Sequence, residues 1–162
     1  MIAITGASGQ LGQATLKHLL TKTEPGNIVA IVRDAQKLES FSGTGIHIRV
    51  ADYNDMASLK IALTGVEELL QISTSSIGEQ AAREEWNVVT AARLQGVRHI
   101  IYTSTVKPQE NHHFLSARQS LKTENDIIAS GMTYTFFRNS LYLETIPQFI
   151  GSGLYDGNIQ FP

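Results

Sequence analysis

The sequence predicts an α/β fold in which helices cover both faces of a doubly wound parallel sheet. Short apolar segments of strand length alternate with longer amphipathic segments along the chain, and this alternation is typical of β-α-β units with right-handed crossovers. A glycine-rich loop also follows the first apolar segment directly. The 162 residues suffice for one α/β domain with a substantial core, so we expect a single domain over residues 1–162.

Six segments have the length and composition of strands. The second is an unbroken apolar run, typical of a strand buried on both faces. The third alternates apolar and polar side chains, which indicates a position near an edge of the sheet. In chain order the strands are predicted over Met1–Thr5, Ile28–Val32, Ile46–Val50, Val66–Ser73, Val97–Ser104 and Met132–Arg138.

Helices are predicted between these strands. Leucines recur at helical spacing in the first helix, and Met56, Leu59 and Leu63 share one face of the third. Gly96 and Gly131 follow the last two helices, where a left-handed residue commonly ends a helix. The helices are expected over Gln10–Thr21, Asp34–Glu39, Asp55–Leu63, Gln80–Gln95 and Ser116–Ser130, with a turn over Pro25–Asn27.

Composition narrows the classes of function. The formal net charge is -2 and no Lys/Arg cluster stands out, so we expect no nucleic-acid partner and no membrane surface. The absence of cysteine excludes disulfides, a thiol nucleophile and Cys-based zinc sites. No apolar run reaches the roughly 18 residues of a membrane span, and we expect no cleaved signal peptide before the first strand. We therefore expect a cytoplasmic protein.

Several conspicuous residue pairs have a plain structural interpretation. His112 and His113 are adjacent rather than spaced for one helix face, so no metal site is predicted. Glu84 and Glu85 are interpreted as solvated helix charges. Ala82, Trp86 and Val89 share a helical face and are assigned to the core or an interface.

Gly6, Gly9 and Gly12 form a G-x-x-G-x-x-G loop between the first strand and the first helix. Gly6 permits the tight turn, Gly9 lets the backbone approach a pyrophosphate, and Gly12 allows close packing of the helix. The N–H groups of the new helix would then meet phosphates, with Ser8 as an additional donor. This loop predicts a Rossmann-type, NAD(P)-binding domain.

The end of the second strand bears on the choice of cofactor. Arg33 follows Val32 there and precedes Asp34. An acidic residue at this point would bind the ribose 2′-hydroxyl, whereas an arginine accommodates a 2′-phosphate. We therefore expect NADP(H) as the preferred cofactor, with NAD(H) as the alternative. The competing interpretation of Arg33 is a surface side chain paired with Asp34.

Five motifs together give the chain a family resemblance: the loop Thr5–Gly12, Val32-Arg33-Asp34, Ala51-Asp52-Tyr53, Tyr102-Thr103-Ser104 and Phe137-Arg138-Asn139. With these in place, the sequence resembles the NmrA-like branch of the atypical short-chain dehydrogenases. Within it, the chain is most similar to bacterial NADPH-dependent quinone oxidoreductases and triphenylmethane reductases. The resemblance extends from Met1 through Asp156–Ile159.

The resemblance implies roles for residues that follow the strands. Asp52 and Tyr53 correspond to adenine-side contacts, although Asp52 is also suited to capping a turn. Ser104 and Tyr142 are the candidate catalytic residues that polarise the acceptor, with Lys107 as a further candidate and simple packing as the alternative for Tyr142. The expected cofactor-binding residues are Gly6, Ser8, Gly9, Gln10, Leu11, Gly12, Arg33, Asp52, Tyr53, Ser73, Thr74, Ser75, Thr103, Arg138 and Asn139.

The chain departs from the broader family in two ways. Ser120–Glu124 occupies the place of the Y-x-x-x-K pair, so the usual tyrosine acid is missing. Relatives also continue beyond Pro162 with the elements that complete the substrate side, whereas this chain stops within an expected strand approach at Ile159–Pro162.

Three functions are compatible with this pattern. The first is an NAD(P)H-dependent oxidoreductase that reduces quinones or similar conjugated acceptors, with catalysis mainly by positioning and cofactor chemistry. The second is a non-catalytic NADP(H) sensor of the NmrA type, which the missing tyrosine and the short chain favour. The third is a reductase of another acceptor, such as a dye, an imine or an aryl ether. A homodimer is left open as the assembly.

Overall fold

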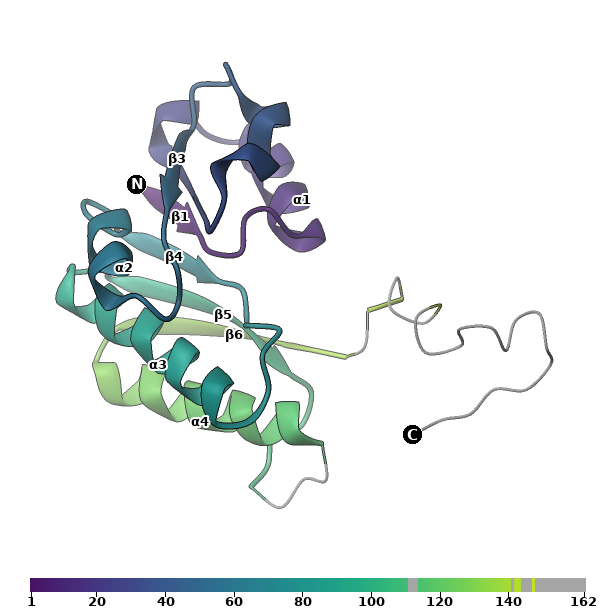
Figure 1. The fold of residues 1–162 in the computed structure, drawn as a ribbon. Helices are drawn as coiled ribbons and strands as arrows, with labels where there is room; N and C mark the ends of the chain where they lie inside the picture. Colours follow the sequence, from purple (N-terminus) through teal and green to yellow (C-terminus); the bar gives the residue numbers. More distant parts are fainter. Residues whose placement is uncertain (111–113, 141, 144–146, 148–162) are drawn as a thin grey trace.

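The structure, a computed structural model, describes residues 1–110, 114–140, 142–143 and 147. Its centre is a six-stranded sheet in which every neighbouring pair is parallel, in the order β3-β2-β1-β4-β5-β6 (Figure 1). The strand order reverses between β1 and β4, and β3 lies at an edge, as predicted. The strands are β1 (Ile2–Ile4), β2 (Ile28–Val32), β3 (His47–Val50), β4 (Glu68–Gln71), β5 (His99–Thr105) and β6 (Thr133–Asn139).

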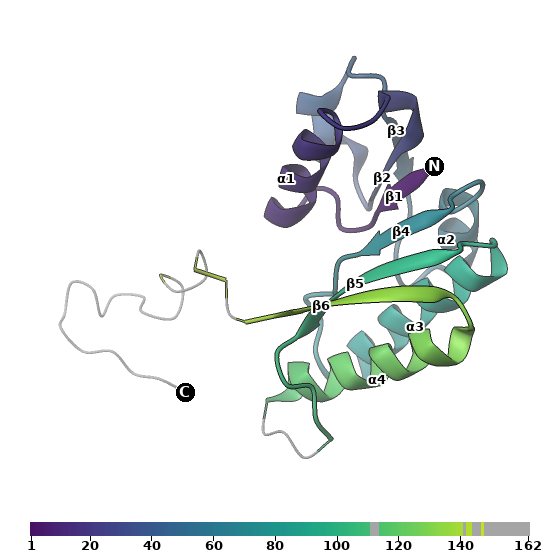
Figure 2. The ribbon, with the colours of Figure 1, turned by 180° about the vertical axis from the view of Figure 1, so that it is seen from behind.

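Helices cover both faces of the sheet (Figures 1 and 2). The α-helix α1 (Gln10–Leu19) and the 3-10 helix η2 (Ala35–Phe41) lie on one face, and α2 (Met56–Ala62), α3 (Gly78–Leu94) and α4 (Leu115–Ser130) lie on the other. A second 3-10 helix, η1 (Pro25–Asn27), forms the predicted turn before β2. Within the described ranges, no helix combines the length and apolarity needed to cross a bilayer.

The alternation of side chains along the strands divides the core into two layers. Ala3 and Ile31 face the layer beneath α2, α3 and α4, whereas Ile4 and Ala30 face the layer beneath α1 and η2. All five residues of β2 are buried, so the prediction of a strand covered on both faces is confirmed. This core holds the carboxyl ends of the strands in one rigid edge.

Some local predictions need correction. The helix predicted over Asp34–Glu39 is a 3-10 helix over Ala35–Phe41, interrupted by non-helical backbone at Leu38. It begins after Asp34 because the Asp34 carboxylate caps it, accepting the N–H of Gln36 at 3.0 Å. Val89 is buried as expected, whereas Trp86 is 47% exposed and lies outside the core, so that of its two assignments only the interface stays a prediction. The Asp156–Ile159 segment and the strand approach at Ile159–Pro162 lie outside the described residues.

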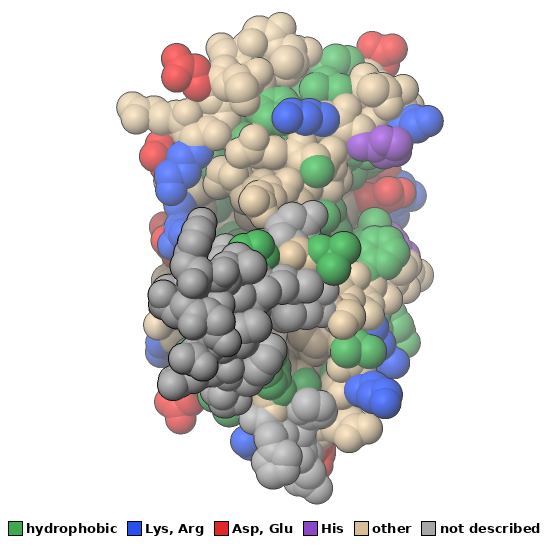
Figure 3. Space-filling model, turned by 90° about the vertical axis from the view of Figure 1, so that its right-hand side faces the viewer, with side chains coloured by type: hydrophobic (Ala, Val, Ile, Leu, Met, Phe, Trp, Pro, Cys, Tyr) green, Lys and Arg blue, Asp and Glu red, His purple; other side chains and the backbone are tan. Residues whose placement is uncertain are grey.

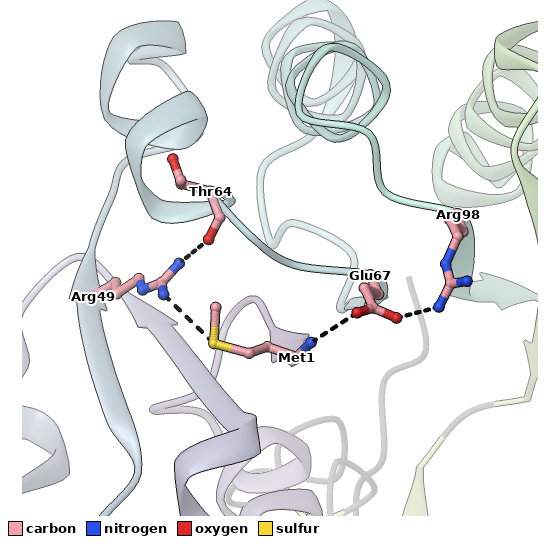
Figure 4. A network of polar contacts seen from close by, with 5 residues as sticks. All are labelled: Met1, Arg49, Thr64, Glu67 and Arg98. Atoms are coloured by element: carbon pink, nitrogen blue, oxygen red, sulfur yellow. Dashed lines mark hydrogen bonds and ion pairs between the residues drawn. The ribbon is translucent and has the colours of Figure 1, made fainter.

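A polar network joins the amino ends of the strands (Figure 4). The Met1 ammonium lies 3.9 Å from the Glu67 carboxylate, which also pairs with Arg98. Arg49 donates hydrogen bonds to the carbonyls of Ala62 at 2.7 Å and Thr64 at 2.8 Å, so it caps the end of α2. This network therefore stabilises the edge of the sheet opposite the carboxyl ends of the strands.

Candidate functional site

The glycine loop after β1 makes a turn that side chains would obstruct. Gly6 has a φ of +62°, a left-handed conformation that glycine adopts without strain. The Gly9 N–H donates to the Gly6 carbonyl at 3.0 Å. A Cβ on Gly12 would lie 2.5 Å from that carbonyl oxygen and 2.6 Å from the Cα of Ala7. Only glycine at position 12 therefore lets α1 begin so close to the loop.

The amino end of α1 presents unpaired backbone donors. Gly9 makes no side-chain cap, and the first turn contains no acidic side chain. The first helical hydrogen bond runs from the Gln13 N–H to the Gly9 carbonyl at 2.9 Å, so the preceding N–H groups point out of the helix end. Gln10 and Leu11 are exposed there. Such an end attracts anions, phosphates above all.

A cleft of about 350 Å³ opens beside this loop, at the carboxyl ends of β1 to β4. Figure 3 views the molecule from this side: uncharged side chains and backbone make up much of the face, and most charged side chains lie toward its margins. The predicted residues that line the cleft are Gly6, Ser8, Gly9, Arg33, Asp52, Tyr53, Ser73, Thr74 and Ser75. The predicted cofactor-binding residues did not include four further lining residues with polar side chains, which are Asn54, Ser76, Gln80 and Glu84.

Arg33 lies at the rim of the cleft with an exposed side chain. The carboxylate of Asp34 caps η2 instead of turning back to the arginine, and the part of the chain that the structure describes contains no Arg33–Asp34 ion pair. The competing interpretation of a surface pair is therefore not observed. The guanidinium is placed to meet an anionic group in the cleft.

The segment after β3 forms one wall of the cleft. The Asp52 carboxylate accepts a hydrogen bond from the Asn54 N–H at 2.7 Å, so it closes a turn as well as lining the cleft. The Tyr53 hydroxyl donates to the Ile72 carbonyl at 2.8 Å, which ties this wall to the chain after β4. Burial, with the nearby Glu85 carboxylate, raises the pKa of Tyr53, so its phenol is neutral.

The opposite wall is held by two glutamates of α3, and here the prediction of solvated charges is wrong. Glu84 and Glu85 are only 5% and 2% exposed. Thr74, in the segment after β4, donates its N–H to Glu85 at 2.7 Å and its hydroxyl to Glu84. The side chain of Asn54 donates to Glu84 at 2.9 Å. Nothing in the helical pattern marks these two glutamates, because their partners come from other segments.

The two carboxyls have opposite pKa shifts. Burial raises the pKa of Glu85 to about 7, and the neighbouring Glu84 charge adds to this effect. Burial also opposes ionisation of Glu84, but hydrogen bonds from Thr74, Gln80 and Asn54 outweigh it and lower the pKa of Glu84. Near neutral pH the pair therefore carries a charge on Glu84, while Glu85 exchanges its proton.

A second polar cluster lies at the carboxyl ends of β5 and β6. Ser104 and Arg138 are partners in the register of these strands. The Ser104 hydroxyl donates to Glu124 of α4 at 2.6 Å, and Arg138 donates to the same carboxylate through Nε at 3.0 Å and Nη2 at 2.7 Å. Glu124 is 2% exposed, and hydrogen bonding to it raises the pKa of Arg138. The carboxylate therefore fixes both predicted site residues.

The remaining predicted residues lie near these two clusters. The Thr103 hydroxyl contacts Ser73, accepting from its N–H at 2.8 Å, and so links β5 to the cleft wall. Asn139 donates to the Tyr142 hydroxyl at 2.9 Å. Lys107 follows β5 with a left-handed φ of 51° and an exposed side chain.

The structure offers no metal centre over the described ranges, where His, Cys, Asp and Glu nowhere gather in a group of three suited to an ion. His112 and His113 lie outside those ranges.

A parallel doubly wound sheet, a glycine loop at its switch point and unpaired donors over a cleft define a dinucleotide-binding Rossmann domain. The comparison with known proteins places the chain more narrowly. A sequence profile of the NAD(P)H-binding family matches residues 6–147. The chain belongs to this family, in its NmrA-like group.

Characterised relatives are similar over most of the chain. Quinone oxidoreductase 2 of Escherichia coli is 43% identical over 89% of this chain and 50% of its own length. An NmrA-like family domain-containing oxidoreductase of Aspergillus flavus is 34% identical over 91% of this chain and 50% of its own. The chain thus spans about half the length of the curated relatives it matches.

Two solved structures have the same fold at similar identity. The NADPH-dependent quinone oxidoreductase of Escherichia coli, complexed with NADPH, superposes with a TM-score of 0.88 and is 41% identical; the match covers 97% of this chain and 55% of that one. The triphenylmethane reductase of Citrobacter sp., complexed with NADP(H), has a TM-score of 0.86 and 39% identity over 96% of this chain and 54% of that one.

Proposed function

We propose that this protein is an NADPH-dependent reductase of quinones or similar conjugated acceptors. One observation carries the proposal: the cleft joins the glycine loop and the donors of α1 to an arginine at its rim. The similarity to quinone oxidoreductase 2 and to the NADPH-complexed structure supports the same choice of cofactor and acceptor. The predicted cytoplasmic location is part of this proposal.

The residues of the cleft fit a dinucleotide. The space that a Cβ on Gly12 would take is needed by the loop itself, so the backbone N–H groups at the start of α1 can approach a pyrophosphate. Arg33 would hold the 2′-phosphate, and Asp52 and Tyr53 would contact the adenine side. Ser73, Thr74 and Ser75 would line the ribose and phosphates, with Thr103, Arg138 and Asn139 nearer the nicotinamide.

On the acceptor side, the chain supplies orientation more than acid–base chemistry. The bound cofactor supplies a hydride. Ser120 replaces the usual tyrosine acid and is buried, and the Ser104 hydroxyl donates to Glu124. The side chain of Arg138, about half exposed, donates to the same carboxylate as Ser104. We propose that Ser104 and Tyr142 help to orient the acceptor, while water delivers the protons that the reduced quinone oxygens take up.

The test is a fluorescence titration of NADPH and NADH with the wild type and Arg33→Ala, followed by addition of a simple quinone. We expect NADPH to bind more tightly than NADH, and Arg33→Ala to weaken NADPH binding by about tenfold or more, since a charge-assisted hydrogen bond contributes roughly 1.5–3 kcal/mol. Addition of the quinone should then speed NADPH oxidation.

The other outcomes are equally informative. NADPH binding without turnover on any quinone or triphenylmethane dye would replace the reductase with the non-catalytic sensor. Turnover on the dye alone would change the acceptor class. Failure to bind either dinucleotide would contradict the proposal altogether.

A further inference from the structure

Glu84 joins the two walls of the cleft through hydrogen bonds that it only accepts. Its Oε1 accepts from the Asn54 side chain at 2.9 Å and from the Gln80 side chain at 2.9 Å. Its Oε2 accepts from the Thr74 hydroxyl. Asn54 belongs to the wall after β3 and Thr74 to the wall after β4. The three donors bond to both oxygens, an arrangement that a carboxylate without a proton satisfies best.

Glu85 is bound differently. Its Oε1 accepts the Thr74 N–H at 2.7 Å, and its Oε2 contacts the side-chain amide of Gln71. That amide can present either its NH₂ group or its oxygen, and the oxygen is buried without another hydrogen-bond partner among the described residues. A proton on Glu85 therefore has an acceptor within reach.

The charges around the pair favour one ionised member. Adjacent carboxyls that share Thr74 in a buried setting repel each other when both are charged. The other titratable side chains that face Glu85 are Tyr53 and Tyr102, and burial raises the pKa of each, so neither supplies a compensating charge.

We propose that ionised Glu84 is a positioning residue that clamps both walls of the cofactor cleft, and that Glu85 supports Thr74 equally well without a charge. The inference rests on the proposed function, because it assigns these walls to NADPH. Neither glutamate is required to touch the reacting atoms. Identical substitutions at the two positions should therefore have different effects.

The matched variants are Glu84→Gln and Glu85→Gln. An amide at position 84 keeps one acceptor oxygen for Asn54 and Gln80 but replaces the acceptor of the Thr74 hydroxyl with an NH₂ donor, so that the Thr74 hydroxyl loses its bond to a charged oxygen and must reverse its direction. We expect Glu84→Gln to raise amide hydrogen exchange by about tenfold in both walls, residues 52–54 and 73–76, and to raise the KM for NADPH by a similar factor with kcat unchanged. An amide at position 85 keeps the oxygen that Thr74 needs, so Glu85→Gln should stay within about twofold of wild type.

Thermal unfolding of each variant checks that it is folded at the assay temperature. The clamp would be overturned if the two substitutions changed amide hydrogen exchange and the KM for NADPH equally. It would also be overturned if Glu84→Gln raised amide hydrogen exchange in only one of the two walls. If wild type binds no NADPH while exchange follows the expected pattern, the clamp holds and the proposed function fails. A change in kcat rather than KM for Glu84→Gln would also contradict a positioning role.

Discussion

At the scale of single residues, Gly12 sets how closely α1 approaches the glycine loop. We expect Gly12→Ala to destabilise the protein by roughly 1–3 kcal/mol, since the new methyl group would overlap the Gly6 carbonyl, a backbone atom with little room to move. The displaced loop should also bind NADPH more weakly. Gly26→Ala is the control, because a Cβ at Gly26 meets no atom within 4 Å. Equal melting temperatures and NADPH affinities for the two variants would contradict this role of Gly12.

Glu85 should make stability depend on pH. Its pKa is raised from 4.5 to about 7 in the folded state, so between these values the folded protein holds a proton that the unfolded chain releases. The contribution is full below about pH 4.5, declines as pH rises through 7, and amounts to as much as about 3 kcal/mol, at about 1.4 kcal/mol per pKa unit.

Urea unfolding of wild type and Glu85→Gln at pH 5 and pH 8 tests this dependence. Relative to the variant, wild type should lose free energy of unfolding at the higher pH. If the difference in free energy of unfolding between the two proteins is the same at pH 5 and pH 8, folding does not raise the pKa of Glu85.

Residues differ in how far the sequence alone could reveal them. Gly6, Gly9 and Gly12 act within one local turn, so their spacing was sufficient to predict that turn. Glu84 and Glu85 depend on partners at positions 54, 71, 74 and 80. That convergence exists only after folding, and a pair of glutamates on an amphipathic helix gives no local sign of it.

At the scale of elements, the places of two strands in the sheet were predictable from their side-chain patterns. β2 is covered on both faces, which its unbroken apolar run indicates, and β3 lies at an edge, which its alternation of apolar and polar residues indicates. The geometry of the helices was less predictable. The segment after β2 departs from helical backbone geometry at Leu38, so it forms 3-10 turns in place of one continuous α-helix. β4 is shorter than predicted, over Glu68–Gln71, because the chain after it turns to form the cleft wall.

The pairing of α4 with β6 through Glu124 and Arg138 should contribute to stability. We expect Arg138→Ala to cost about 2–4 kcal/mol, since among the described residues it leaves the buried Glu124 carboxylate with the Ser104 hydroxyl as its remaining side-chain donor. Arg98→Ala is the matched control: its ion pair with Glu67 is exposed on both sides, so the expected cost is below about 1 kcal/mol. Chemical unfolding measures both. Similar costs would mean that Glu124 is not held as the structure indicates.

At the scale of the whole molecule, the cleft is lined entirely by residues between Gly6 and Glu84, whereas the cluster around Arg138 lies on β5, β6 and α4. The cleft proposed to hold most of the cofactor and the cluster beside which the nicotinamide and the acceptor are proposed to meet are therefore formed by different parts of the chain. The relatives named as oxidoreductases extend to about twice the length matched here.

Ligand-linked stability therefore tests the cleft separately from catalysis. A ligand at about 100 times its Kd stabilises the folded state by roughly 2.7 kcal/mol, which for a protein of this size raises the melting temperature by about 5–10 °C. We expect NADPH to produce this shift and NADH at equal concentration to produce a smaller one. Only NADPH carries the ribose 2′-phosphate that Arg33 is proposed to bind. Arg33→Ala should bring the two shifts together. If the difference between NADPH and NADH persists in Arg33→Ala, another group selects the phosphate; if neither dinucleotide shifts the wild type, the cleft does not bind them.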